Sequence, residues 1–73
     1  MRTQFAIDVP QRQPGLIGFV FGKLFAKKFL FEVDARIRVE CDVLITVSTG
    51  RADEMRQILR ESDFEAWNER EVE

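Results

Sequence analysis

The sequence predicts a small α+β fold, in which an antiparallel sheet of three or four strands is covered by a C-terminal amphipathic helix. Apolar side chains recur at every second residue from Phe29 to Val47, which is the period of an extended chain with one buried face. Apolar residues return at helical spacing in the stretch 52–70. A chain of 73 residues without a long linker is expected to form one domain, residues 1–73.

The first strand is predicted near the N-terminus, where polar and apolar residues alternate. One face of this strand would carry Thr3, Phe5, Ile7 and Val9. Pro10 ends the pattern, and the polar residues 11–15, with a second proline and a glycine, form a connection.

Residues 16–28 are ambiguous between helix and strand, because their apolar side chains surround a helical wheel almost completely. Inside a helix, Gly18 and Gly22 would each cost about 1 kcal/mol relative to alanine. The length of the stretch and the lack of a tight hairpin signal favour a helix over residues 19–28.

The alternating run from Phe29 to Ser48 is too long to be one straight strand of a compact monomer. Its 20 residues would extend about 66 Å, whereas a globule of this size has a diameter of roughly 29 Å. The run must therefore fold back, bend at a bulge, or be shared with a second chain. We expect its odd-numbered residues from Phe31 to Val47 to be buried and its even-numbered residues, such as Thr46, to face water.

The charges on the even-numbered residues restrict the pairing register. Antiparallel pairing centred on Val39 places Arg side chains opposite acids, whereas pairing centred on Ile37 opposes like charges. Centring on Ala35 is also acceptable. Both acceptable registers suit an internal hairpin or a two-fold dimer. We expect a homodimer, in which the ladder would consist of Arg36, Arg38, Glu40 and Asp42.

A helix over residues 52–70, capped by Ser48 or Thr49, is expected to cover the sheet. Its apolar stripe consists of Ala52, Met55, Ile58, Leu59, Ser62 and Ala66. Phe64 falls opposite that stripe, and residues 62–65 have a capping-box pattern. Either the helix restarts there, or Phe64 is an exposed aromatic, which we expect to anchor a partner. The remaining alternative is that the helix breaks at Ser62 and Phe64 fills the core. The charged tail 69–73 is expected to fray.

Composition argues against enzymatic and metal chemistry. The chain has no histidine and one cysteine, Cys41, which cannot supply a zinc site or an internal disulfide. No glycine-rich phosphate loop or nucleophile elbow is present. We therefore expect no catalytic residues, no cofactor and no metal. With a lone cysteine and no secretion signal after Met1, a cytoplasmic location is expected.

The charge distribution indicates a protein-binding role. Five basic residues against one acid give residues 1–31 a charge of +4, and six arginines against twelve acids give residues 32–73 a charge of −6. An acidic helical surface with an aromatic anchor is typical of docking on a protein partner. We expect a non-catalytic module, a small regulator or inhibitor, that uses this surface and the sheet edge. The candidate contact residues are Phe64, Trp67, Glu61, Glu65 and Glu69.

A basic and aromatic stretch supports an alternative, a nucleic-acid-binding module. Its candidate residues, which would also suit a membrane surface, are Lys23, Lys27 and Lys28 among several phenylalanines. A membrane span is not expected, because Lys23 interrupts the apolar run well short of the ~20 residues needed.

Overall fold

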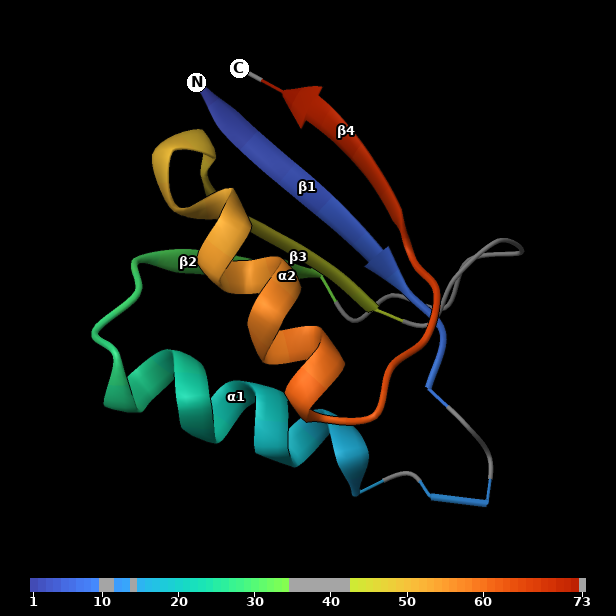
Figure 1. The fold of residues 1–73 in the computed structure, drawn as a ribbon. Helices are drawn as coiled ribbons and strands as arrows, with labels where there is room; N and C mark the ends of the chain where they lie inside the picture. The colour runs from blue at the N-terminus through green and yellow to red at the C-terminus, as the bar shows by residue number, and fades with distance from the viewer. Residues whose placement is uncertain (10–11, 14, 35–42, 73) are drawn as a thin grey trace.

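The computed structural model describes residues 1–9, 12–13, 15–34 and 43–72. The elements in chain order are β1 (Arg2–Ile7), α1 (Leu16–Ala26), β2 (Phe31–Asp34), β3 (Val43–Ser48), a 3₁₀ turn η1 (Thr49–Arg51), α2 (Ala52–Glu61) and β4 (Asn68–Val72). A four-stranded antiparallel sheet with two helices confirms the predicted α+β class (Figure 1).

The strand order in the sheet is β2-β3-β1-β4, and every neighbouring pair is antiparallel. Helix α1 connects β1 to β2 with β3 between them, and α2 connects β3 to β4 with β1 between them. The chain is thus two interleaved β-α-β units, which is the ferredoxin-like arrangement. Both helices lie on one face of the sheet (Figure 1). Many unrelated functions use this arrangement, so function must be argued from the surface.

Strand β1 lies in the interior of the sheet and alternates as predicted. Thr3, Phe5 and Ile7 are buried, and the residues between them are partly exposed. β1 has β3 on one side and β4 on the other. Its helix-facing side chains therefore lie between those of the two neighbouring strands and under the helix layer (Figure 1). The strand ends at Ile7 rather than at Val9.

Helix α1 resolves the ambiguity of residues 16–28 in favour of a helix, which begins earlier than residue 19. Val20 and Leu24 are its buried residues. They pack in one core with Met55, Ile58 and Leu59 of α2. The stretch is apolar on all sides because its outer side is apolar too, and not because it is buried all round.

Strands β2 and β3 pair within one chain, in one of the two registers that the charges allow. Phe31 pairs with Val47 and Val33 with Ile45, so the pairing is symmetric about position 39. The length of the alternating run therefore requires no second chain. Arg36, Arg38, Glu40 and Asp42 of the expected dimer ladder lie outside the described residues.

Burial along this hairpin follows the predicted alternation only in part. Ile45 and Val47 are buried as expected, but Val33 is 42% exposed because β2 is the last strand of the sheet. Thr46, expected to face water, is buried. It lies between Gln4 and Glu32 on the two flanking strands, whose longer side chains shield it.

Helix α2 is shorter than predicted, and its start differs too. It ends at Glu61, so residues 62–70 are not helical. Neither Ser48 nor Thr49 gives it a side-chain cap; the 3₁₀ turn precedes it instead. The Thr49 hydroxyl is hydrogen-bonded to the Thr3 hydroxyl at 3.0 Å, which ties the turn to β1.

Helix α1 ends in a Schellman motif without glycine. Lys28 adopts a left-handed conformation with φ 57°. The backbone N–H of Phe29 donates to Leu24 O at 3.0 Å, and that of Lys28 donates to Phe25 O at 3.1 Å. Phe29 is buried directly after the turn. The helix therefore stops where an aromatic side chain enters the core.

Helix α2 ends in the same motif, which corrects the prediction for Phe64. Asp63 has φ 68°, and the Phe64 N–H donates to Leu59 O at 3.0 Å. Phe64 is only 5% exposed and belongs to the core. The helix does not restart and Phe64 is not an exposed aromatic. The residues read as a capping box form a helix C-terminus instead.

The charged C-terminal segment is a strand, which corrects the expectation that it frays. β4 pairs with β1 from Arg2–Val72 to Ala6–Asn68, and the two chain ends lie side by side (Figure 1). Main-chain hydrogen bonds to β1 stabilise this segment, so it forms with almost no apolar residues. The remaining stripe residue, Ala66, is exposed in the connection to β4.

Candidate protein-binding surface

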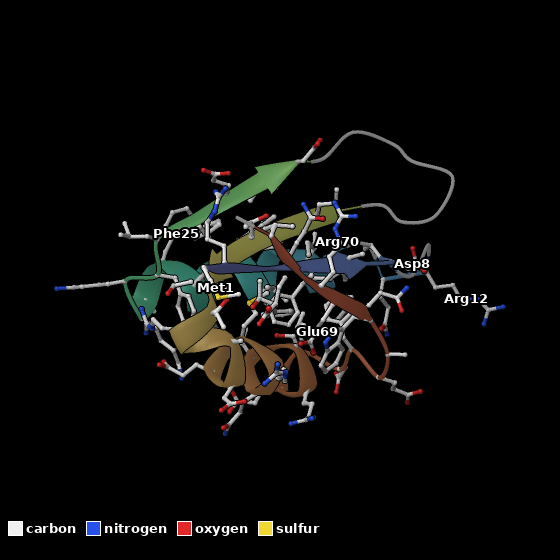
Figure 2. The ribbon with its side chains drawn as sticks, turned by 90° about the horizontal axis from the view of Figure 1, so that it is seen from above. Met1, Asp8, Arg12, Phe25, Glu69 and Arg70 are labelled. Atoms are coloured by element: carbon white, nitrogen blue, oxygen red, sulfur yellow. The ribbon has the colours of Figure 1, made fainter. Side chains whose placement is uncertain are left out.

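The acidic surface predicted to bind a partner is occupied by intramolecular ion pairs around Arg56. The Arg56 guanidinium donates to both carboxylate oxygens of Glu69, at 2.8–3.0 Å, and also contacts Asp53. These hydrogen bonds from Arg56 lower the pKa of Glu69, and the Trp67 N–H acts in the same direction. Glu69 on β4 and Arg56 on α2 thus fasten the last strand to the helix layer (Figure 2).

Trp67 takes part in the same network. Its indole N–H donates to Glu69 at 2.9 Å, and the Arg60 guanidinium lies 5.9 Å from the ring centroid. The side chain is half-buried against the core. Trp67 therefore has a structural role in joining the residues before β4 to α2.

Glu61 is paired as well, with a residue of the predicted basic patch. Its carboxylate lies 3.2 Å from Lys23 Nζ, and this pair joins the ends of the two helices. Lys27 and Lys28 are exposed, and their backbone carbonyls accept hydrogen bonds from Arg51 at 3.2 and 3.4 Å. Of the three lysines of the predicted patch, Lys23 is thus paired with an acid of α2, whereas Lys27 and Lys28 are exposed.

Arg51 has several contacts at this end of α1. It donates to Glu54 at 2.9 Å, and this hydrogen bond lowers the pKa of Glu54. Its guanidinium carbon lies 3.7 Å from the centroid of the Phe29 ring. Phe29 is thereby covered, so it cannot stack on a nucleic-acid base.

The candidate contact residues thus separate into three groups. Glu61, Glu69 and Trp67 have partners inside the molecule. Phe64 is in the core. Glu65 is exposed and lies in the short connection between α2 and β4. The predicted aromatic anchor, Phe64, is buried and is therefore not exposed beside it.

A different surface carries the exposed apolar residues. Apart from Met1 at the chain end, the exposed large hydrophobic residues of the described chain all lie on or between α1 and β2: Phe19, Phe25, Leu30 and Val33. Phe25 is 71% exposed and Leu30 is 90% exposed. We give the name α1–β2 surface to Phe25 and Val33 together with the partly buried Phe31, whose ring contacts Phe25. Figure 2 shows Phe25 far from Glu69 and Arg70.

The α1–β2 surface is supported by an aromatic cluster. The Phe31 ring lies 6.2 Å from Phe21 in a stacked arrangement and 5.5 Å from Phe25 edge-on, between ring centroids. Phe21 and Phe31 are partly buried against the core. Phe25 is therefore held in place from one side while its other side is open to solvent.

The sequence of α1 carries a signal for this surface. The apolar residues surround α1 almost completely, and a helix on one face of a sheet can bury only part of such a circle. Phe19 and Phe25 had to remain outside. The Phe-rich stretch was read instead as core with a basic end.

The sheet face away from the helices does not resemble a nucleic-acid platform. Its described residues on the two interior strands are Arg2, Gln4, Ala6, Leu44, Thr46 and Ser48. Sheets that bind single-stranded RNA place stacking aromatics at such positions. Here the face carries polar pairs, namely Arg2–Glu32 at 3.0 Å and Arg70–Gln4 at 3.1 Å.

A shallow groove of about 490 Å³ lies between the start of α2 and β4. It is lined by the charged side chains of Asp53, Arg56 and Glu69, among others. The Arg56 guanidinium pairs with both carboxylates, so the three side chains together keep a charge of −1. Within the part of the chain that the structure describes, no group of three or more potential ligands is arranged to hold a metal ion.

Comparisons with known proteins leave these surfaces as the basis for function: no protein-family model, no curated protein and no solved structure matches the chain. In the described ranges, no helix has the length and apolar character needed to cross a membrane. The structure thus offers one apolar surface and one acidic surface whose candidate residues Glu61 and Glu69 are paired within the molecule.

Proposed function

We propose that this protein is a non-catalytic protein-binding module, a small regulator or inhibitor, that docks on a larger protein through the α1–β2 surface. The exposed Phe25 and Val33 carry the proposal: the Phe25 ring lies 5.5 Å from that of Phe31, and Val33 follows Phe31 on the same face of β2. Exposed apolar residues scattered singly are ordinary, whereas adjacent ones mark interaction sites. A cytoplasmic setting, in which the single cysteine stays reduced, belongs to the same proposal.

The energy of such an interface is expected to concentrate in a few aromatic anchors. Phe25 suits this role because Phe31 fixes one side of its ring while the other side is open. A ring that is already positioned loses little conformational freedom on binding. Glu61 and Glu69, by contrast, would have to give up their partners Lys23 and Arg56 to contact another protein.

The test is site-specific photocrosslinking of the full chain in its native host. A benzophenone amino acid replaces Phe25 in one variant and Glu65 in a second, matched variant on the acidic side. The proposal predicts a discrete crosslinked protein from position 25 and none from position 65. That protein, once identified and purified, should bind the Phe25→Ala variant more weakly by about 2 kcal/mol and the Glu65→Ala variant unchanged.

Two results would overturn the proposal. One is crosslinking to a protein from position 65 that the Phe25→Ala change leaves intact. The other is recovery of nucleic acid whose binding falls steeply with salt and is lost on replacing Lys27 and Lys28 by glutamine.

A further inference from the structure

The outer edge of β2 is a row of backbone groups next to the α1–β2 surface. β2 is the terminal strand of the sheet, and β3 is its neighbour among the described residues. An edge strand presents N–H and C=O groups that can pair with another strand. Proteins usually protect such edges with charged side chains or proline. The helix-facing residues of β2, Phe31 and Val33, provide no such protection.

The helix-facing side of this edge would receive apolar side chains. Phe25 extends from α1 to within 5.5 Å of the Phe31 ring, centroid to centroid, and is mostly exposed beyond it. Val33 is 42% exposed on the same face. A strand added beside β2 would bury its inward side chains against Phe25, Phe31 and Val33, which continues the sheet and its core by one strand.

The opposite side of the edge is acidic. Glu32 and Asp34 alternate with Phe31 and Val33, so both carboxylates lie on the sheet face away from the helices. Glu32 remains 75% exposed while paired with Arg2. A shallow hollow of about 290 Å³ opens beside it, lined in part by Leu30 and Ser48. Cationic side chains of an added strand would meet negative charge here.

A second copy of this chain fits the edge poorly. Antiparallel pairing of two β2 strands about Val33 would oppose Glu32 with Asp34 of the other copy, and like charges opposite each other are unfavourable. Pairing of β2 with β4 of another copy would bring Glu69 and Glu71 against the apolar side, because these two residues lie on the helix-facing side of β4. The occupant must be apolar on one face and basic on the other.

We infer that β2 binds an extended segment of a partner protein as a fifth strand, and that this segment alternates apolar with Lys or Arg residues. Recognition by strand addition takes affinity from main-chain hydrogen bonds and specificity from alternate side chains. The inference rests on the proposed function and names the chemistry of its partner. It also explains why the aromatic cluster lies beside an edge strand rather than in the middle of the helix layer.

The test uses fluorescent synthetic peptides and the full chain, with binding followed by fluorescence anisotropy. The probe is Lys-Val-Arg-Val-Lys-Val. One control has the same residues in blocks, Val-Val-Val-Lys-Arg-Lys, and another replaces every cation by glutamate. The alternating basic peptide should bind, and both controls should bind at least about fivefold more weakly, since opposite-charge cross-strand pairs each contribute up to about 1 kcal/mol.

Two N-methylated versions of the probe test the main-chain pairing directly. Alternate N–H groups of a strand point to opposite sides, so methylation of one alternate set should abolish binding and methylation of the other should leave it intact. Equal binding of both versions would overturn strand addition. Equal binding of the blocked peptide, or tighter binding to phosphatidylserine vesicles than to the peptide, would overturn it as well.

Matched variants of the two sheet edges complete the design. Glu32→Lys and Val33→Lys on β2 should each weaken binding of the probe peptide. Glu71→Lys on β4 should change the affinity for the peptide less than twofold. A melting curve for each variant confirms that it folds. If photocrosslinking from position 25 finds a protein while no peptide binds, strand addition fails and the docking proposal stands. If neither occurs, both fail.

Discussion

The two edge strands of the sheet follow helix ends of the same kind but carry different side chains. β2 and β4 each follow a helix that ends in a left-handed residue and a buried phenylalanine, Phe29 or Phe64. β4 then carries Glu69, Arg70 and Glu71, with Glu69 bound to Arg56 and Arg70 to Gln4. β2 carries Phe31 and Val33 beside the exposed Phe25.

This difference indicates which edge meets a partner. Both edge strands carry acids, and Glu32 on β2 is paired with Arg2. On β4, however, Glu69 and Glu71 occupy the helix-facing side, where an added strand would have to bury its side chains, whereas on β2 that side is apolar. Apolar residues on β2 would be a liability in a free monomer, which makes sense if another protein covers them. The two halves share a local plan. In the proposed function their edge residues give them separate tasks, in which β4 closes the fold and β2 binds the partner.

The largest expected effect contrasts the buried aromatic before β4 with the exposed aromatic beside β2. Phe64→Ala should lower the free energy of unfolding by about 3–5 kcal/mol, because it removes a core side chain. Phe25→Ala should cost no more than about 1 kcal/mol, the scale of one aromatic pair. Urea denaturation of the two variants measures both values. Comparable losses would mean that Phe25 is structural and that the α1–β2 surface is part of the core.

An intermediate effect concerns the two helix ends that lead to the edges. Lys28 and Asp63 adopt a left-handed conformation, which costs free energy for residues with a side chain and which glycine adopts without strain. Lys28→Gly and Asp63→Gly should each stabilise the fold by about 1 kcal/mol. Asp53→Gly, in the first turn of α2, is the matched control and should destabilise by a similar amount. Destabilisation by all three changes in thermal melts would refute the shared helix ending.

The smallest expected effect is the pH-dependent contribution of the Arg56–Glu69 pair to the stability of the fold. Arg56 lowers the pKa of Glu69 in the folded state. The folded protein then holds the ionised form more strongly than the unfolded chain does, so the pair stabilises above the ordinary glutamate pKa of 4.5. This stabilisation is lost as pH falls through the lowered pKa.

The melting temperature of the wild type against Glu69→Gln, measured from pH 7 to pH 2, checks this linkage. The wild type should melt higher at neutral pH, and the difference should shrink at acidic pH. A constant difference would show that Glu69 contributes by packing or neutral hydrogen bonds and that β4 is not fastened by charge.

The sequence was sufficient where side-chain burial decides structure. The alternation in β1 and the apolar stripe of α2 follow from which residues avoid water. Opposed charges reduce the register of the β2–β3 hairpin to two possibilities, one of which is observed. Helix α1 followed from length, with its start misplaced by three residues.

The sequence was insufficient where long-range main-chain pairing or unusual turns decide structure. β4 has almost no apolar residues, and it forms because β1, some 65 positions earlier, offers an edge. The helix end at Asp63 lacks the usual glycine. Residues 62–65 fit a helix start as well as a helix break, so the sequence alone cannot decide whether Phe64 is exposed or in the core. Of the contact surfaces predicted from the sequence, only the sheet edge remains in the proposal. Glu61 and Glu69 have partners within the molecule, and these pairings could not be predicted from the sequence alone.

Amide hydrogen exchange of the full chain, with and without the Lys-Val-Arg-Val-Lys-Val peptide, tests the central contrast most directly. Exchange is compared between β2 (Phe31–Asp34) and β4 (Asn68–Val72). The account predicts that bound peptide slows exchange in β2, where outward N–H groups gain partners, and leaves β4 unchanged. Slowing in β4, or no change in β2 while the peptide is bound, would contradict it.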